Sequence, residues 1–390
     1  MSGLQALLRV RETYIGIVAT IAFQLIFFSI WMTAYDGVDE RVGQLTIGFV
    51  SEDAELDQQV AKNMKSAIPF SIEDYSSMAQ AERALNARQI NMIVQIPDDF
   101  THHIQAGKEA EIIYAINQAN ASVAKNIMEN AAKQITEELN HTLYPLQQNQ
   151  AIEAFSQQIA QLPFEQNTAQ QITASVKTTM MNVKAHAADE TILKTNNVKG
   201  FAANFIPLMV IISSFVGAMV MIMQHQQAAQ IVQASLSKWQ LFLARQLLNI
   251  AVAFTLPLLT ISLMHLFGIA SNESLLSIYC FQSVMFLAFL CLAQVFVIAF
   301  GNLGMVFNIC ALSLQLVTSG VLVPKIMLSE GYKQVAAMLP ATYGADGYYT
   351  IIFGGSADNL LQNTSALAII ILITMAISTT VVALKPAPVQ

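Results

Sequence analysis

Two acidic and two histidine side chains lie close together in the segment IPDDFTHHIQAG (residues 96–107), and these residue types bind metal ions in many proteins. Asp98 and His102, like Asp99 and His103, are four positions apart, which places each pair on one face of a helix. Adjacent histidines, however, point about 100° apart on a helix, so both cannot face one ion. We therefore expect no metal site here.

The same segment carries the signals of a short helix. Pro97 suits the first helical turn, and Gly107 suits the C-terminal end. Asp98 and Asp99 complement the positive end of the helix dipole. A structural role therefore explains this cluster better than metal binding does.

The sequence lacks the motifs of the common catalytic sites. It contains no G-x-S-x-G, no H-E-x-x-H and no G-x-x-x-x-G-K-[ST]. The cysteines Cys280, Cys291 and Cys310 lie in apolar stretches, where cysteine usually packs as a small apolar residue. We expect no enzyme activity and no cofactor, and any ATP hydrolysis that drives this protein must come from another chain.

The composition indicates an α-helical integral membrane protein. Of the 390 residues, 54% are hydrophobic and 12% are charged. Apolar runs long enough for a helix to cross about 30 Å of hydrocarbon occur once near the start, too long for a cleavable signal peptide, and repeatedly after Lys199. Only helices satisfy the backbone polar groups of such a run in lipid. The six predicted transmembrane helices are residues 14–34, 201–223, 247–269, 278–300, 305–323 and 366–384.

Basic residues beside these helices predict their orientation. Arg9 and Arg11 precede the first helix. Lys238 and Arg245 lie between the second and the third, and Lys385 follows the sixth. With six crossings all five lie on one side, and such positive flanks mark the cytoplasmic side. We expect a multi-pass protein of the plasma or inner cell membrane with both termini in the cytoplasm.

This topology divides the chain into three parts. Residues 1–34 form a tail and the first transmembrane helix, 35–200 form a large extracytoplasmic domain, and 201–390 form a five-helix transmembrane domain with an outer re-entrant hairpin at 324–360. The middle part holds 21 of the 26 Asp and Glu and 12 of the 19 Lys and Arg, a net charge of about −9. Nucleic acid binding needs a basic face, so we expect no nucleic acid partner.

The extracytoplasmic domain begins with alternating strand and helix signals. Apolar runs at residues 45–50, 70–75, 90–96 and 109–116 predict four strands. Helices are predicted between the first three, from the acidic turn at 51–53 to Met64 and over residues 77–86. This alternation predicts a small α/β unit whose sheet is covered on at least one face.

The rest of this domain is predicted to be helical. Two apolar stripes, at positions 127, 131, 135 and 139 and at 152, 155, 159 and 162, lie on either side of Pro145. We expect the proline to make the turn of an antiparallel hairpin, with a third helix over residues 168–183. Packing, dimerisation and ligand contact all remain open as its role.

Polar residues inside the predicted transmembrane helices are further candidates for function. No Asp, Glu, Lys or Arg lies deep in any of these helices, which argues against a proton-driven antiporter, because such pumps carry an ionisable group near the midplane. The intramembrane polar residues are Gln24, His265, Gln294 and Gln315. The glutamines either bridge helices or bind substrate, and bridging is favoured.

The whole layout resembles the type-2 ABC exporter permeases. LTIGFV with its acidic turn, and INMIVQIPDDFTHHIQAG ahead of EIIYAINQAN, are similar to the outer-domain pattern of that family. The stretch VLVPKIMLSEGYKQVAAMLPATYGADGYYTIIFGG (residues 321–355) resembles more closely the YhgE/Pip and nitrosoguanidine-resistance branch.

The resemblance implies a loop that contacts an ATPase subunit. In the family this loop joins the second and third transmembrane helices, which here is residues 224–246. Its best-matching positions are Ser237, Lys238, Trp239 and Arg245. The sequence departs at residues 226–229, which are Gln-Gln-Ala-Ala where ATPase-coupled permeases usually carry an acidic turn with Gly and Thr.

The resemblance also makes the outer hairpin a candidate exit gate. We expect Pro324 to end the fifth transmembrane helix, Pro340 to end a short amphipathic helix, and Tyr343, Tyr348 and Tyr349 to lie at the membrane interface. The candidate gate residues are Pro324, Gly331, Tyr332, Pro340, Tyr343 and Gly344.

Two functions follow from the resemblance. The first is the permease subunit of an ABC-type exporter, which moves a hydrophobic or amphipathic substrate outward as a homodimer or heterodimer together with a separate cytoplasmic ABC ATPase. The alternative is a YhgE/Pip-like cell-surface protein, which docks a phage or another partner or serves as a secretion accessory without an ATPase. An adjacent ATPase gene would favour the first and an isolated gene the second.

Overall fold

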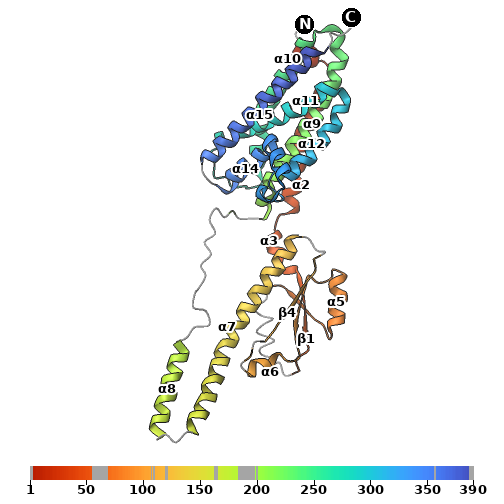
Figure 1. Ribbon diagram of the computed structural model, residues 1–390. Coiled ribbons are helices and arrows are strands. Elements are labelled where there is room, and N and C mark those ends of the chain that lie inside the picture. The colour runs from red at the N-terminus through yellow and green to blue at the C-terminus, as the bar shows by residue number, and fades with distance from the viewer. Residues whose placement is uncertain are drawn as a thin grey trace. The chain divides into compact units, whose positions relative to one another are not determined.

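The chain divides into two units, a helical one and an α/β one. A computed structural model describes residues 3–54, 69–106, 108, 110–118, 122–161, 166–182, 198, 201–354 and 357–385. The helical unit comprises Met1–Val38 and Lys194–Gln390, and the α/β unit comprises Asp39–Leu193 (Figure 1).

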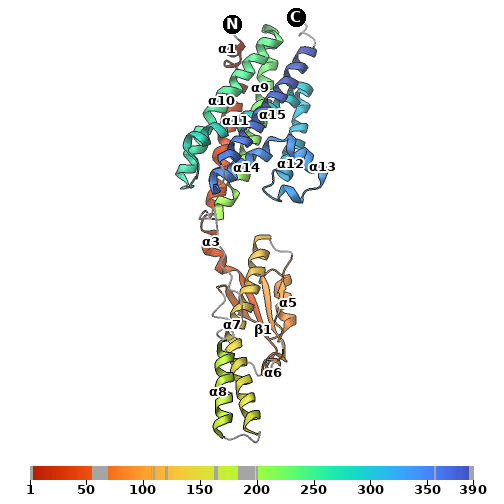
Figure 2. The same ribbon diagram turned by 60° about the vertical axis from the view of Figure 1, so that its left-hand side comes forward.

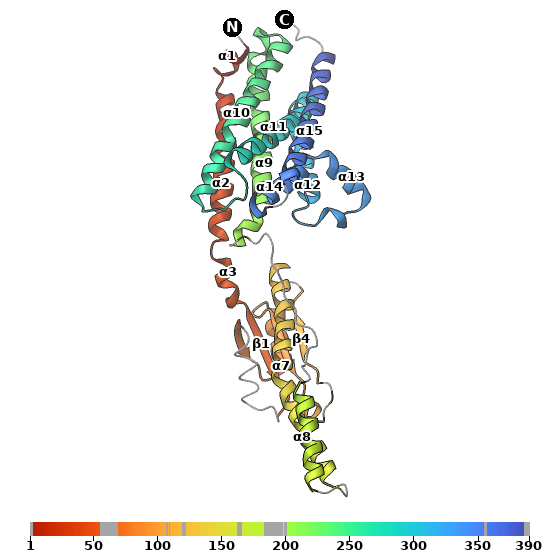
Figure 3. The same ribbon diagram turned by 90° about the vertical axis from the view of Figure 1, so that its left-hand side faces the viewer.

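The helical unit is a bundle in which α11 lies at the centre. Helix α11 contacts α9, α10, α12, α14 and α15, and one large apolar core surrounds it (Figure 3). The helices of this unit are α1 (Gly3–Leu7), α2 (Arg11–Ala34), η2 (Phe201–Phe205), α9 (Ile206–Val232), η3 (Gln233–Ser235), α10 (Lys238–Leu266), α11 (Leu275–Phe300), η4 (Gly301–Leu303), α12 (Gly304–Thr318), η5 (Lys325–Met327), α13 (Glu330–Met338), α14 (Pro340–Phe353) and α15 (Ala357–Leu384).

Five stretches among the described residues are long and apolar enough to cross a membrane. They are Arg11–Gln44, Ala203–Ser235, Lys238–Leu266, Leu275–Thr318 and Asp358–Leu384. The predicted fourth transmembrane helix and most of the predicted fifth lie in Leu275–Thr318, which the structure folds back at Gly301. A multi-pass helical membrane protein is therefore supported, and the count of six crossings stays a prediction.

Two glycines form the turn between α11 and α12. Gly301 has a φ of 62°, which L side chains rarely adopt. A Cβ on Gly304 would lie 2.4 Å from the backbone oxygen of Phe296, so α12 begins in direct contact with the end of α11. With 15 residues, α12 is about 22 Å long, shorter than the hydrocarbon layer.

The fifth predicted helix ends earlier than expected. Helix α12 ends at Thr318, and Gly320 follows with a φ of 86°. The prediction that Pro324 ends the helix is therefore wrong. The reason is that Gly320 supplies the left-handed residue common after helix C-termini, so the chain has already left the helix when it reaches the proline.

The segment predicted as an outer re-entrant hairpin (residues 324–360) contains a second helix that the sequence did not indicate, α14, which packs into the bundle. Pro340 occupies the first turn of α14, where its missing N–H costs nothing, so the prediction that it only ends the preceding helix is incomplete. Tyr348 is fully buried, so its predicted place at the membrane interface is wrong, whereas Tyr343 and Tyr349 are half-buried. The amphipathic helix predicted before Pro340 is present as α13.

Small residues allow α14 to approach α11 and α9. A Cβ on Gly347 would lie 2.0 Å from Cζ of Phe281, and one on Gly344 would lie 2.8 Å from Sδ of Met285. The same device joins α2 to α9, where the Thr20 hydroxyl donates to the backbone oxygen of Gly217 at 3.0 Å. The bundle thus depends on close backbone contacts.

The α/β unit has a four-stranded sheet in the order β2-β1-β3-β4. Its elements are α3 (Val38–Arg41), η1 (Val42–Gln44), β1 (Thr46–Ser51), β2 (Ser71–Asp74), α5 (Met78–Asn86), β3 (Met92–Ile96), α6 (Phe100–Gln105), β4 (Ile113–Ile116), α7 (Ser122–Ala160) and α8 (Gln166–Asn182). Strands β2, β1 and β3 are parallel, and β4 is antiparallel to β3. The four predicted strands are confirmed, while most of the helix predicted to Met64 lies outside the described residues.

Helices cover both faces of this sheet (Figures 1 and 2). Ile47 and Phe49 of β1 join a core with α6 and α7, and the next residue, Val50, joins a core with α5 on the opposite face. This alternation is the two-residue period of a strand. The sequence predicts a sheet that is covered on at least one face, and in the structure helices cover both faces.

The predicted turn at Pro145 is wrong. Helix α7 runs unbroken from Ser122 to Ala160 with Pro145 inside it, and the antiparallel partner of α7 is α8. Ile135, Leu139 and Leu143 of α7 are buried in the domain core. This packing stabilises the helix on the N-terminal side of the proline, which offsets the one hydrogen bond that proline removes.

The close contact of α14 with α11 leads to a stability prediction. Gly347→Ala places a methyl group inside the buried Phe281 ring and should lower the free energy of unfolding by about 1–3 kcal/mol. Gly331→Ala is the matched control, because a Cβ on this exposed α13 residue meets no described atom within 4 Å and should be neutral or stabilise by up to about 1 kcal/mol. Thermal unfolding of the two variants in detergent measures the difference. Equal melting temperatures would contradict the placement of α14.

Candidate functional site

The turn between α9 and α10 holds most of the candidate ATPase-contacting residues. Ser237 begins α10 with a capping box: its hydroxyl accepts from Gln240 N at 3.2 Å, and its own N–H donates to Gln240 Oε1 at 3.0 Å. Helix α10 therefore starts at Lys238, nine residues before the predicted transmembrane helix at 247. The segment predicted as a loop is mostly two helix ends joined by a short, fixed turn.

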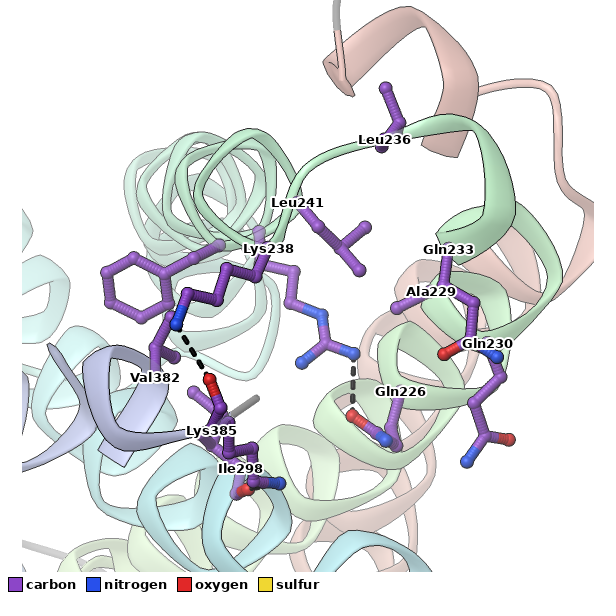
Figure 4. Close-up of a pocket in the computed structure, with 12 residues that line it drawn as sticks. Gln226, Ala229, Gln230, Gln233, Leu236, Lys238, Leu241, Ile298, Val382 and Lys385 are labelled. Carbon is purple, nitrogen blue, oxygen red and sulfur yellow. Dashed lines mark hydrogen bonds between the residues drawn. The ribbon is translucent and has the colours of Figure 1, made fainter. Parts of the chain in front are cut away.

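A pocket of about 240 Å³ lies beside this turn (Figure 4). Residues from α9, α10, α11 and α15 line it, together with Lys385 just beyond α15. Both chain termini lie at this same end of the helical unit (Figure 3). The pocket brings together segments that are more than 130 residues apart in the sequence, Gln226–Arg245 and Val382–Lys385.

Three cations line the pocket and hold its walls together. Lys238 Nζ donates to the backbone oxygens of Ala383 at 2.9 Å and of Lys385 at 2.7 Å. Lys385 Nζ donates in turn to the backbone oxygen of Ile298. Both lysines thus neutralise the negative C-terminal ends of helices, α15 and α11 respectively. Partial burial and the nearby Arg245 guanidinium lower the pKa of Lys385.

The third cation, Arg245, has donors to spare. One terminal nitrogen donates to Gln226 Oε1 at 2.6 Å and to the backbone oxygen of His225 at 3.3 Å. Its Nε is buried and has no hydrogen-bond partner among the described residues. The arginine therefore fixes α10 to α9 while its side chain lines the pocket.

A buried polar layer lies next to Arg245. The side-chain amides of Gln246 and Gln294 bond each other, at 3.0 Å and 3.2 Å, and Asn249 Nδ2 donates to Gln294 Oε1 at 3.0 Å. His225 is 1% exposed, and its ring lies close enough to Asn249 and Arg245 to interact with both. Sequence reasoning missed Gln246, Asn249 and His225, although Arg245 and Asn249 share the i, i+4 spacing of one helix face.

The four predicted contact residues do not all meet. Ser237, Lys238 and Arg245 lie at the turn or in the pocket, whereas Trp239 is 41% exposed, packs edge-on against Phe242 and does not line the pocket. The walls from α11 and α15 were not predictable from this segment. Only the tertiary fold brings Ile298, Val382 and Lys385 to it.

The candidate gate residues are divided rather than clustered. Pro324, Gly331 and Tyr332 are exposed, whereas Pro340 and Gly344 are buried in the bundle. Tyr343 is half-buried and donates from its hydroxyl to the backbone oxygen of Ala337 at 2.9 Å, beside α13. These six residues do not form one site.

Helix α14 is held in place by contacts of other residues, which lie near the candidate gate residues. Lys325 forms an ion pair with Asp346, and the Tyr348 hydroxyl donates to Gln282 Oε1 in the buried core. Gln282 Nε2 lies 3.5 Å from the Ser214 hydroxyl, so the contact reaches α9.

The intramembrane glutamines bridge helices. Gln24 Oε1 accepts from Ser213 Oγ at 3.0 Å, and its Nε2 donates to Thr260 Oγ1 at 3.2 Å, which links α2, α9 and α10. Gln315 Oε1 accepts from the backbone N–H of Ala341 at 3.3 Å, at the start of α14. These two glutamines and Gln294 thus bond across helices, in keeping with the bridging role favoured from the sequence. His265 differs, because it is exposed in the last turn of α10.

The acidic and histidine cluster of the α/β unit forms helix α6. Asp99 and His103 approach to 3.6 Å, while Asp98 and His102 are exposed. Asp99 occupies the N-cap position, but its side chain makes no capping hydrogen bond; instead Asp53 Oδ2 accepts from the N–H of Thr101 at 2.6 Å. The helix starts at Phe100, after Pro97, and Gly107 lies outside the described residues.

Comparison with known protein families gives a match over almost the whole chain. The family described as "ABC-2 family transporter protein" matches residues 14–380, from α2 through the α/β unit to α15. No curated protein matches the chain.

Proposed function

This chain belongs to the ABC-2 family of transporter proteins and is a membrane permease subunit of an ABC transporter, and on that premise we propose that it exports a hydrophobic or amphipathic compound. The sequence has no P-loop, so a separate ABC ATPase supplies the energy. The observation that carries the proposal is the fixed α9–α10 turn, which presents its capped helix end at the surface of the bundle. The resemblance to the YhgE/Pip branch stays a prediction.

The proposed topology places this turn and both termini in the cytoplasm. Arg9, Arg11, Lys238 and Lys385 belong to that end of the helical unit, in keeping with positive flanks on the cytoplasmic side. At the opposite end of α2, Tyr35 stacks on Phe205 with ring centroids 4.8 Å apart, and Trp31 packs against the same ring. Such aromatic rings suit the outer membrane interface, so the α/β unit inserted between them is extracytoplasmic in this proposal.

The permease is proposed to act as a dimer, either of two identical chains or of two related ones. Large apolar side chains are exposed on α2, α10, α12 and α15. A membrane bundle covers such faces with lipid or with another bundle. A transport path between two copies would use part of this surface.

The proposed gate is helix α14. It neither crosses the membrane nor leaves the bundle, and specific contacts hold it: the Lys325–Asp346 ion pair on one side and the buried Tyr348–Gln282 hydrogen bond on the other. A short helix fixed by a few polar contacts can exist in two discrete positions. Its movement would open the path outward.

The coupling role of the turn leads to a binding prediction. Trp239→Ala should reduce co-purification of the ATPase, and ATP-dependent export, at least about tenfold, because an exposed tryptophan is a common binding hot spot. Trp31→Ala is the matched control, since Trp31 belongs to the aromatic cluster at the other end of α2. Affinity purification from native membranes measures both. Equal ATPase recovery with the two variants would contradict the proposal that the α9–α10 turn contacts the ATPase.

The gate leads to a separate prediction. Tyr348→Phe removes the hydrogen bond to Gln282 and should raise leakage of substrate without ATP roughly fivefold, as a loss of about 1 kcal/mol from the closed position implies. Tyr332→Phe, at an exposed position on α13, should leave leakage unchanged. Efflux from preloaded proteoliposomes measures it. A variant that only folds less well, with normal leakage per folded protein, would show that α14 is a fixed structural element.

A further inference from the structure

The pocket beside the α9–α10 turn has the lining of an anion site. Lys238, Arg245 and Lys385 line it, and none of its described lining residues is acidic. The side-chain amides of Gln226, Gln230 and Gln233 add neutral polar groups on the α9 side, as Figure 4 shows. An electropositive, amide-rich pocket of this kind favours a phosphate or a carboxylate.

Arg245 supplies the unused donor. The two bonds that it makes come from one terminal nitrogen, and its buried Nε has no partner among the described residues. That nitrogen is enclosed by protein, so the donor that an anion in the pocket can use is the other terminal nitrogen, which makes no hydrogen bond among the described residues. The guanidinium is also the side chain best shaped to bind a phosphate through two parallel hydrogen bonds.

The other half of the lining is apolar. Leu241, Phe242, Ile298 and Val382 face the same cavity as the cations. The pocket lies where α10 begins and α15 ends, so in a membrane it lies at headgroup depth. Just below it Leu243 and Leu247 are exposed on the surface of α10, as on a lipid-facing helix. A small water-soluble anion makes no favourable contact with the apolar half of the lining, whereas the glycerol and acyl chains of a lipid do.

We propose that this pocket binds the headgroup of an anionic phospholipid. The phosphate lies against Lys238, Arg245 and Lys385, and the glycerol and first methylenes lie against Phe242, Ile298 and Val382. Basic pockets between transmembrane helices bind anionic headgroups in this way. The proposal requires the helical unit to be in a membrane, but it does not depend on export or on an ATPase.

Native mass spectrometry of the purified full chain tests the proposal. The detergent-solubilised protein is titrated with phosphatidylglycerol, with phosphatidylcholine and with inorganic phosphate. We expect one phosphatidylglycerol to bind at least tenfold more tightly than phosphatidylcholine. The double variant Lys238→Gln/Lys385→Gln should weaken phosphatidylglycerol binding by roughly 25-fold, about fivefold for each cation removed.

The matched control is Arg9→Gln/Arg11→Gln. It removes the same charge from exposed residues at the same end of the helical unit, outside the pocket, and should leave the affinity within about twofold. Equal loss in both double variants would mean general surface attraction and would overturn the site. Inorganic phosphate that competes as well as the lipid would assign the pocket to a free anion instead.

A second measurement distinguishes lost lipid binding from misfolding of the variant. The lysines also bond helix ends, so each variant is first compared with the natural chain by size-exclusion chromatography and thermal unfolding. If Lys238→Gln/Lys385→Gln does not fold, Gln230→Glu is used, which adds one negative charge to the exposed rim of the pocket and should weaken phosphatidylglycerol binding about fivefold. Unchanged affinity in a folded pocket variant would overturn the proposal. So would an acidic segment of a bound ATPase that occupies the pocket and excludes the lipid.

Discussion

The bilayer offers no hydrogen-bond partner, so the backbone N–H and C=O groups of the helical unit must find their partners within the protein. Helix α14 illustrates this constraint, because its start is buried in the bundle and its end packs against the loop between α10 and α11. At its start the N–H of Ala341 donates to Gln315 Oε1 at 3.3 Å. At its end the N–H and the side-chain amide of Asn272 donate to the backbone oxygens of Ile351 and Ile352, both at 2.8 Å. Without these partners a helix that stops within the membrane would be unstable.

The same constraint explains why glutamine and asparagine recur along α11 and its neighbours. Gln282 connects to α14 and α9, Gln294 connects to two residues of α10, and Asn308 of α12 donates to the Ala293 backbone oxygen of α11. In the core, side-chain amides form the hydrogen bonds between helices. At the pocket end, lysines form these bonds instead, because a charged ammonium group can stay near water there. The same two lysines therefore bond the ends of α15 and α11 and give the pocket its positive charge.

Much of the fold was predictable from local patterns. Long apolar runs predicted the helices α2, α9, α10, α11 and α15, and short apolar runs predicted the four strands. Helix α14 was not predictable, because Pro340 reads equally well as the end of one helix and the first turn of the next. Its small buried residues, such as Gly344 and Gly347, also give no amphipathic signal. Pro145 shows the opposite error, since a strong local breaker was overridden by packing along α7.

The candidate site was partly predictable for a similar reason. Ser237, Lys238 and Arg245 lie in one segment, so a resemblance over that segment was enough to find them. Lys385 and the partners of Arg245 come from other helices, and only the tertiary structure brings them there. The central claim, that this chain is a permease driven by a separate ATPase, is tested most directly by reconstituting both chains in proteoliposomes. We predict that an amphipathic dye moves outward with ATP and stops when the Walker lysine of the ATPase is replaced. Movement that persists unchanged in that variant, or its absence while the ATPase is bound and active, would contradict the account.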